Sequence, residues 1–113
     1  MAWFRVHVLM QAASGMDGAN PVQAHELEYA VAAMDAMEAE DKAETLAARE
    51  NIAWRCLGST RTVKFSNSAQ PLNDVEDGAQ LSAQILEFAD AGALRRYLVG
   101  QAQPIRILPN ARP

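Results

Sequence analysis

The hydrophobic spacing changes from two residues to three or four at Asp35, and this change constrains the fold more than any other feature of the sequence. Upstream of it, apolar side chains alternate with Glu26 and Glu28 as far as Ala33. Such an alternation predicts a strand with one face in the core and the other toward solvent. We therefore expect a half-buried strand from Glu26 to Ala33, with Leu27, Tyr29, Val31 and Ala33 on its apolar face.

A helix is expected to begin at Ala36, because Asp35 followed three residues later by Glu38 is an N-terminal capping signature. Either Asn51 or Gly58 can end it, so we keep both an end near Glu50 and an end at Leu57. The expected packing face is mostly alanine, and small residues bury little area each. Its members are Ala36, Ala39, Ala43, Leu46 and Ala47, with Ala53, Trp54 and Leu57 added if the helix continues.

The other segments predict further strands and one more helix. Residues 78–88 fit either a helix, with Leu81, Ile85 and Phe88 on one face, or a strand. Gly92 would weaken the middle of one long helix by about 1 kcal/mol relative to Ala, so we favour a strand at 84–88 and a helix capped by Asp90. The remaining expectations are a strand at 3–10, a connection at 11–23, a strand at 52–57 if the first helix is short, a strand at 60–66, a loop at 67–73, a helix at 91–99 and an edge strand at 104–109.

These elements predict an α+β fold of order ββαββαβ, with a largely antiparallel sheet and two helices packed on one face. We expect a single domain over residues 1–109 and a frayed tail at 110–113. From the first helix onward the chain resembles half of a ferredoxin-like fold. Residues 85–99, ILEFADAGALRRYLV, resemble the strand-to-helix passage of the small dimeric α+β-barrel proteins. The resemblance implies a topology and carries over no functional residue.

The charge of the chain is unevenly distributed. Residues 1–50 carry nine acidic and three basic residues, net −6, and residues 51–113 carry five acidic and seven basic residues, net +2, within a total of −4. This balance argues against general nucleic-acid binding, which needs a basic surface. Because the chain has one cysteine, no membrane-length apolar span and no signal-peptide pattern, we expect a cytoplasmic protein.

No catalytic, metal or cofactor motif stands out in the sequence. His7 and His25 are expected near one end of the sheet, close to Glu26, but a metal site needs further ligands at defined spacing. Cys56 has basic neighbours but no identifiable base, so a buried inert thiol is favoured over a nucleophile. We therefore expect no cofactor and no metal, and we favour a non-catalytic role while leaving an enzyme open.

The leading hypothesis is a small protein-interaction module. It would act through the acidic first helix or an open sheet face, as an inhibitor or adaptor that competes for a basic surface. The partner would be another protein or a second copy of the chain. The candidate surface comprises Asp35, Glu38, Glu40, Asp41 and Glu44 on the helix, and Trp3, Arg5, His7 and Leu9 on the first strand.

Two alternatives stay open. The first is a dimeric α+β-barrel-type small-molecule binder or cofactor-free enzyme, in which His7, Tyr29 or Arg5 lines a pocket between the sheet and the helices. The second is a structural subunit of a larger assembly. If the first two strands pair antiparallel, Arg5 and His7 are also expected to face the two glutamates of the second strand across the ladder.

Overall fold

The computed structural model describes residues 2–12, 21–66 and 75–109. They form strands and helices in the predicted order, ββαββαβ. The elements are β1 (Ala2–Ala12), β2 (Val22–Ala33), α1 (Ala36–Glu50), β3 (Trp54–Ser66), β4 (Ala79–Phe88), α2 (Ala91–Leu98) and β5 (Arg106–Pro109). The predicted loop at 67–73, most of the connection at 11–23 and the predicted tail at 110–113 lie outside the described residues. Within the described ranges, no helix has the length and apolar character needed to cross a membrane.

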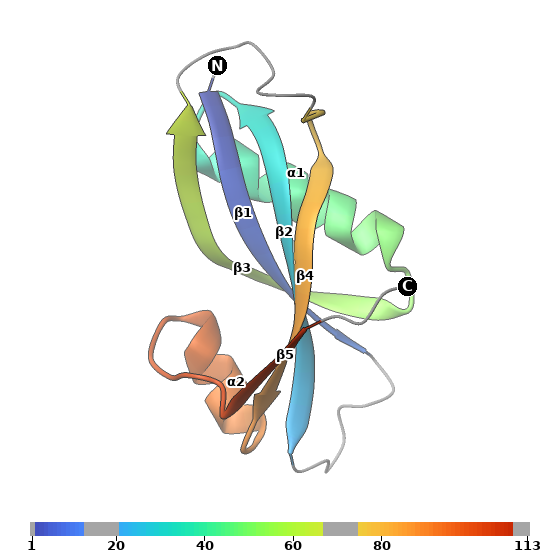
Figure 1. The fold of residues 1–113 in the computed structure, drawn as a ribbon, viewed down its shortest axis with the longest axis vertical. Coiled ribbons are helices and arrows are strands. Elements are labelled where there is room, and N and C mark those ends of the chain that lie inside the picture. Colours follow the sequence, from blue (N-terminus) through green and yellow to red (C-terminus); the bar gives the residue numbers. More distant parts are fainter. Residues whose placement is uncertain (1, 13–20, 67–74, 110–113) are drawn as a thin grey trace.

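The five strands form one antiparallel sheet in the order β3-β1-β2-β4-β5 (Figure 1). The α+β class is therefore confirmed. β1 and β2 are the central hairpin, with Ala2 opposite Ala33 and Met10 opposite His25. β5 lies at an edge, as the prolines at 104 and 109 predict, because an edge strand tolerates residues that cannot donate to the ladder.

α1 begins and ends where local signals place it. Asp35 accepts a hydrogen bond from the N–H of Glu38 at 2.9 Å, which confirms the predicted cap. The helix takes the shorter of the two expected lengths because Asn51 closes it: both its backbone N–H and its side-chain amide donate to the carbonyl of Ala47. Gly58 instead lies inside β3, at a φ of 134° that favours glycine. The two strands expected at 52–57 and 60–66 are thus one continuous strand, β3.

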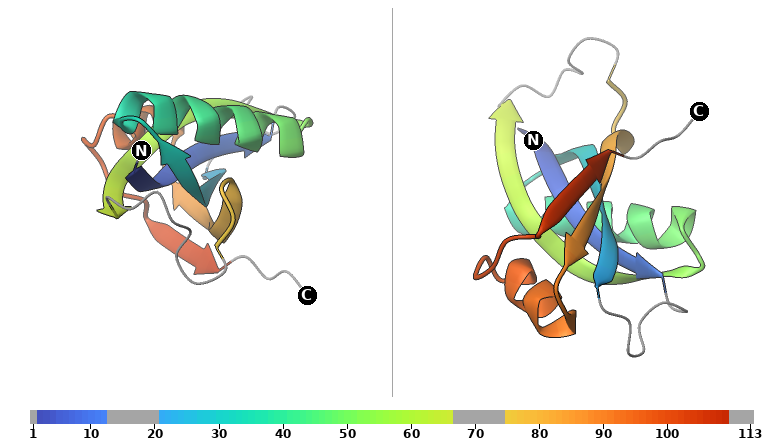
Figure 2. Two further views of the ribbon diagram at one scale, coloured as in Figure 1. Left: turned by 90° about the horizontal axis from the view of Figure 1, so that it is seen from above. Right: turned by 60° about the horizontal axis from the view of Figure 1, so that its bottom comes forward.

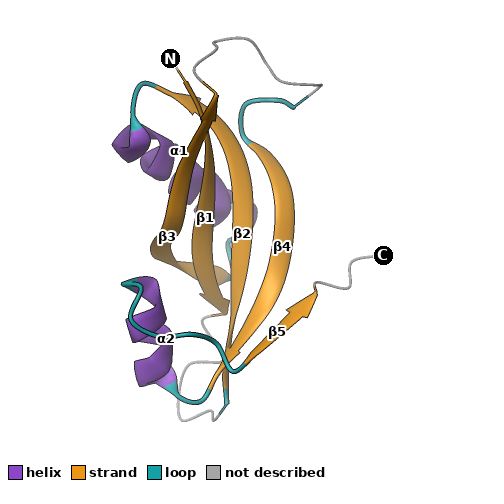
Figure 3. Ribbon diagram, turned by 60° about the vertical axis from the view of Figure 1, so that its left-hand side comes forward, coloured by secondary structure: helices purple, strands orange, loops and turns teal. Residues whose placement is uncertain are grey.

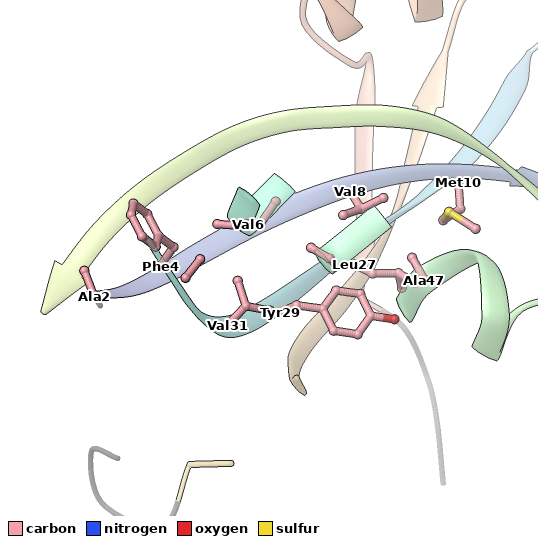
Figure 4. Packing of buried hydrophobic residues seen from close by; sticks show 12 residues of the cluster. Ala2, Phe4, Val6, Val8, Met10, Leu27, Tyr29, Val31 and Ala47 are labelled. Carbon is pink, nitrogen blue, oxygen red and sulfur yellow. The ribbon is translucent and has the colours of Figure 1, made fainter. Parts of the chain in front are cut away.

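α1 packs on the sheet through alanine, as predicted. Ala39, Ala43 and Ala47 are completely buried, whereas Ala36, at the first turn, is exposed. Apart from the half-buried Leu46, the packing face of α1 has only small side chains, and the strands beneath it supply most of the apolar area of this core (Figure 4). The sheet side of this core comprises Ala2, Phe4, Val6, Val8 and Met10 of β1 and Leu27, Tyr29, Val31 and Ala33 of β2.

The prediction that both helices pack on one face is wrong. Side chains alternate between the faces of a strand, and Val8 lies in the core beneath α1 while Leu9 lies in the core beneath α2. In Figure 3, α1 is behind the sheet and the segment from α2 to β5 passes in front of it. The reason is that one end of the sheet is apolar on both faces, and α2 covers Leu9, Leu86 and Phe88, which would otherwise face water.

The ambiguous segment at 78–88 is a strand from Ala79 onward, β4, which contains the strand at 84–88 that the position of Gly92 favours. Asp90 then caps α2, since its side chain accepts the N–H of Ala93 at 2.7 Å. Seen from above, α1 lies along one side of the sheet (Figure 2, left). The core residues beneath α2 belong to the other face, at one end of the sheet. The part of that second face left beside α2 is where the polar side chains of the central strands gather.

Candidate functional site

Two of the predicted acidic residues, Asp35 and Glu38, form the start of α1. Asp35 caps the helix, and Glu38 in turn accepts the backbone N–H of Met34 at 3.1 Å. Both side chains are exposed at the surface. Their carboxylates therefore serve the helix terminus while keeping their charge near its positive end.

Glu40 and Glu44 lie one turn apart on the side of α1 that borders β3. Glu40 accepts a hydrogen bond from the hydroxyl of Thr62 at 2.6 Å, and Glu44 accepts one from Ser59 at 2.5 Å. The predicted acidic surface is thus divided into two groups. Asp35 and Glu38 cap the start of α1, and Glu40 and Glu44 are hydrogen-bonded along β3. Asp41, the fifth predicted residue, is exposed and lines a cleft between α1 and β3.

Trp3 and Leu9 do not lie on the surface. Trp3 is 3% exposed and packs against Phe65, with ring centroids 6.3 Å apart, and Leu9 is fully buried beneath α2. The sequence places both on the second face of β1, but it does not show that other parts of the chain cover that face. Neither residue can therefore supply the exposed apolar centre expected for an open sheet face.

Arg5 and His7 lie on this second face. The predicted cross-strand pairing is confirmed for His7, which is opposite Glu28, whereas Arg5 is opposite Ala30 and extends over the ring of Phe65 at 5.1 Å. His7 lies between two carboxylates. Its Nε2 is 3.1 Å from Glu28 and its Nδ1 is 3.5 Å from Glu26, so both ring nitrogens point at acceptors.

Glu26 is the centre of this polar cluster and is only 5% exposed. Besides His7, its carboxylate accepts hydrogen bonds from Thr60 of β3 at 2.9 Å, Gln84 of β4 at 3.1 Å and Tyr97 of α2 at 2.6 Å. A buried charge is costly unless it is paired and hydrogen-bonded, and here donors from four elements meet it. We refer to Glu26 and its partners His7, Thr60, Gln84 and Tyr97 as the Glu26 cluster.

The protonation states in the Glu26 cluster are set by these contacts. Burial alone would raise the pKa of Glu26, but hydrogen bonds from His7, Tyr97, Thr60 and Gln84 outweigh it and lower that pKa to about 2. The hydrogen bond to Glu26 raises the pKa of His7, and burial together with the same carboxylate raises the pKa of Tyr97. At neutral pH, Glu26 is therefore charged and Tyr97 is a neutral donor.

A pocket of about 350 Å³ opens beside the Glu26 cluster, between the sheet and the segment that follows α2. His7 lines it, as the small-molecule alternative predicts, but Arg5 does not, and Tyr29 is fully buried in the core beneath α1. The exposed guanidinium of Arg61 lies at this pocket. The lining residues are His7, Glu26, Thr60, Arg61, Gln84, Tyr97, Gly100, Ala102 and Gln103.

Sequence reasoning missed Thr60, Gln84 and Tyr97, which come from three separate elements. The burial of Glu26 had a signal in the sequence, because Glu26 shares a strand face with the apolar residues Val22 and Ala24. Thr60 and Gln84 had no comparable signal, because isolated polar residues on strands usually face solvent. The spacing of Tyr97 from Leu94 places its ring on the buried side of the second helix, but it does not identify the partner of its hydroxyl.

Both histidines are close to Glu26, as predicted, because His25 precedes it in β2 and His7 contacts it from β1, but the two lie on opposite faces of the sheet. His25 is on the α1 face of β2 and stacks on Trp54 at 4.1 Å, whereas His7 is on the opposite face. Among the residues that the structure describes, no group of three or more His, Cys, Asp or Glu side chains is arranged to hold a metal ion. Cys56 is half-buried beneath α1, and burial raises the pKa of its thiol.

The chain matches no protein-family model, no curated protein and no solved structure. The expected likeness to the α+β-barrel proteins therefore has no support from a solved structure. Function has to be argued from the two sites just described, the Glu26 cluster and the acidic border of α1 with β3.

Proposed function

We propose that the protein is a non-catalytic protein-interaction module that binds its partner along the border of α1 and β3. The observation that carries this proposal is that Glu40 and Glu44 are held over β3 by the hydroxyls of Thr62 and Ser59. A carboxylate that is already anchored loses less conformational freedom on binding than a free one. The partner would present a basic surface, and the protein would act as an inhibitor or adaptor that competes for it.

The shape of the border supports the same proposal. A cleft of about 400 Å³ lies between α1 and β3, and one of the two anchored carboxylates, Glu44, lines it together with Asp41. The other lining residues are Thr45, Ala48, Cys56, Leu57 and Gly58, of which Ala48, Cys56 and Leu57 contribute apolar groups. A long basic side chain fits such a cleft, because its methylene stem can lie on the apolar part while its charge meets a carboxylate.

Capture of the partner from a host lysate tests the proposal. The double variant Glu40→Gln, Glu44→Gln removes both charges but keeps an oxygen that accepts from Thr62 and Ser59. We expect captured partner to fall by about tenfold, which corresponds to about 1.4 kcal/mol of binding free energy. The loss should be largest at low salt, where surface charges are screened least.

The matched control is the double variant Glu50→Gln, Glu76→Gln. Both residues are exposed, and neither lies at the border of α1 and β3, so this variant has the same net charge as the test variant. Equal losses in the two variants would attribute binding to net charge alone. Unchanged capture by the test variant, with its thermal unfolding midpoint preserved, would eliminate the acidic border as the binding surface.

The proposed setting is the cytoplasm, where a lone thiol stays reduced. Cys56 is the single cysteine of the sequence, and its thiol is free. Localisation of a tagged chain by fractionation of the native host tests this part. Recovery from an extracytoplasmic fraction would contradict it.

A second candidate function is small-molecule binding at the pocket beside the Glu26 cluster. The specific observation is that Glu26, almost completely buried, positions His7 and Tyr97 at one pocket. Such a pocket with a few convergent polar groups is the usual form of a ligand site. With Arg61 at the pocket, the expected ligand is a small polar molecule that carries a carboxylate or phosphate.

Two-dimensional amide NMR of the 15N-labelled protein, titrated with a set of small carboxylates and phosphates, distinguishes this candidate. Binding should shift the amides of Gly100, Ala102 and Gln103 and should be lost in Arg61→Ala. Arg55→Ala is the matched control, because Arg55 is an exposed arginine of the same strand outside this pocket. If no member of the set shifts these amides, the pocket is not a site for this ligand class.

A further inference from the structure

The free edge of the sheet at β3 is its longest available hydrogen-bonding surface. β3 has 13 residues and pairs only with β1 among the described strands, so its outer side presents backbone N–H and C=O groups. The opposite edge is β5, which has four residues and contains Pro109. An extended chain can therefore add to this sheet more readily at β3 than at β5.

The two sides of β3 carry different side chains. Thr62 and Lys64 are opposite Val6 and Phe4 and so share the face covered by α1. Arg61 and Val63 are opposite His7 and Arg5 on the other face. A strand added beside β3 would thus meet the two anchored carboxylates of α1 and Lys64 on one face, and Arg61 and Val63 on the other. The two carboxylates outweigh the single positive charge of Lys64, so the first face attracts basic side chains.

We infer that the partner binds as an extended segment that adds to the sheet beside β3, with basic side chains at alternate positions facing α1. The spacing supports this. The β3 residues that hold Glu40 and Glu44, Thr62 and Ser59, are opposite Val6 and Val8 of β1, which are two positions apart. If an added strand follows β3 as β1 does, its alternate lysines or arginines lie beside the two carboxylates.

The intervening side chains of the added strand lie beside Arg61 and Val63 and should be acidic or apolar. Opposite charges at neighbouring cross-strand positions contribute about 0.2–1 kcal/mol per pair, and like charges cost similar amounts. The preferred segment therefore alternates basic residues with acidic or β-branched ones. This pattern deepens the proposed function and rests on it.

A second copy of the chain is a poorer occupant of this edge. Antiparallel pairing of two β3 strands about a two-fold axis would place both α1 helices on the same face of the joined sheet. Glu40 and Glu44 of one copy would then face those of the other across the junction. Repulsion between the two acidic rows disfavours that dimer.

Synthetic ten-residue peptides test the inference. The probe has lysine at every second position and valine or glutamate between, and its binding to the full chain is followed by fluorescence anisotropy and amide hydrogen exchange. We expect saturable binding and slowed exchange of amides in β3. The first control has the same residues with the lysines grouped at one end, and it should bind about tenfold more weakly.

The second control separates strand addition from charge attraction. Two peptides are N-methylated, each at one of the two alternate sets of residues, because only one set directs its N–H groups toward β3. Every side chain stays in place, so a peptide that adds as a strand should lose at least about tenfold in affinity in one of the two forms. Equal binding of the unmethylated peptide and both methylated peptides would overturn strand addition. It would leave the acidic border itself to be judged by the partner-capture test above. A dimeric mass for the unliganded chain, with β3 amides protected, would instead assign the edge to a second copy.

Discussion

The phenolic hydroxyl of Tyr97 donates a 2.6 Å hydrogen bond to Glu26, which lies 71 positions earlier in the chain. This bond joins α2 to the middle of β2 across the second face of the sheet. The ring of Tyr97 also packs on Phe88, with centroids 5.2 Å apart. Tyr97 therefore holds α2 on the sheet through two contacts, the packing of its ring on Phe88 and the hydrogen bond from its hydroxyl to Glu26.

Tyr97→Phe should lower the free energy of unfolding by about 1.5–3 kcal/mol, because a hydrogen bond to a buried charge is lost while the ring contact is kept. Urea denaturation of the wild type and the variant measures the difference. Gln80→Ala, an exposed β4 residue outside the Glu26 cluster, serves as the control. A change below about 0.5 kcal/mol for Tyr97→Phe would contradict the proposed importance of this bond.

Acid stability should depend on Glu26. Its pKa is lowered from 4.5 to about 2 in the folded chain, so its contribution to stability is fully present above pH 4.5 and is lost as the pH falls toward 2. Unfolding by urea at a series of pH values measures this slope. In Glu26→Gln the slope between these pH values should flatten, and an unchanged slope would assign acid unfolding to other carboxyl groups.

His7 should act in the opposite direction. Because its folded pKa lies above 6.5, its contribution is present below pH 6.5 and disappears as the pH rises through the raised value. NMR titration of the imidazole gives the folded pKa directly. In Glu28→Gln, which removes one of the two flanking carboxylates, we expect the pKa of His7 to fall; a pKa at or below 6.5 in the wild type would refute the ion-pair geometry.

Close packing of α1 on the sheet predicts a sharp contrast between two alanines of that helix. Ala43 is fully buried and Ala48 is exposed. Ala43→Leu should cost about 1–3 kcal/mol of stability, since added methylene groups have no space, whereas Ala48→Leu should change stability by less than about 0.5 kcal/mol. Thermal and urea unfolding of the two variants compares them, and equal effects would mean that the helix is free to move away from the sheet.

Much of the local structure could be predicted because it depends on neighbours along the chain. Asp35 and Asp90 cap helices through backbone groups three residues away, and their signatures are visible in the sequence. The strand at 84–88 was favoured over a helix from the position of Gly92. The exact extent of β3 was harder, because Gly58 reads as a helix stop and serves instead as an irregular position in a long strand.

The candidate sites were less accessible to prediction. The acids of α1 were identified, but the division of that set between helix cap and β3 border depends on Thr62 and Ser59, which approach only in the folded chain. The sequence places Trp3 and Leu9 on the correct strand face and includes both in the candidate contact surface. Their burial depends on Phe65 and on α2, which the local pattern of β1 does not encode.

The sequence by itself determined the order of the elements, the strand-to-helix change at Asp35 and the alanine face of α1, since periodicity and capping act over a few residues. Only the tertiary structure decided that α2 covers the second face of the sheet and that Glu26 is buried there. Thr60, Gln84 and Tyr97 reach that carboxylate from 34, 58 and 71 positions away. A buried charge is tolerated only where its hydrogen-bond donors all surround it in the folded chain. That arrangement depends on the whole fold and not on any local stretch of sequence.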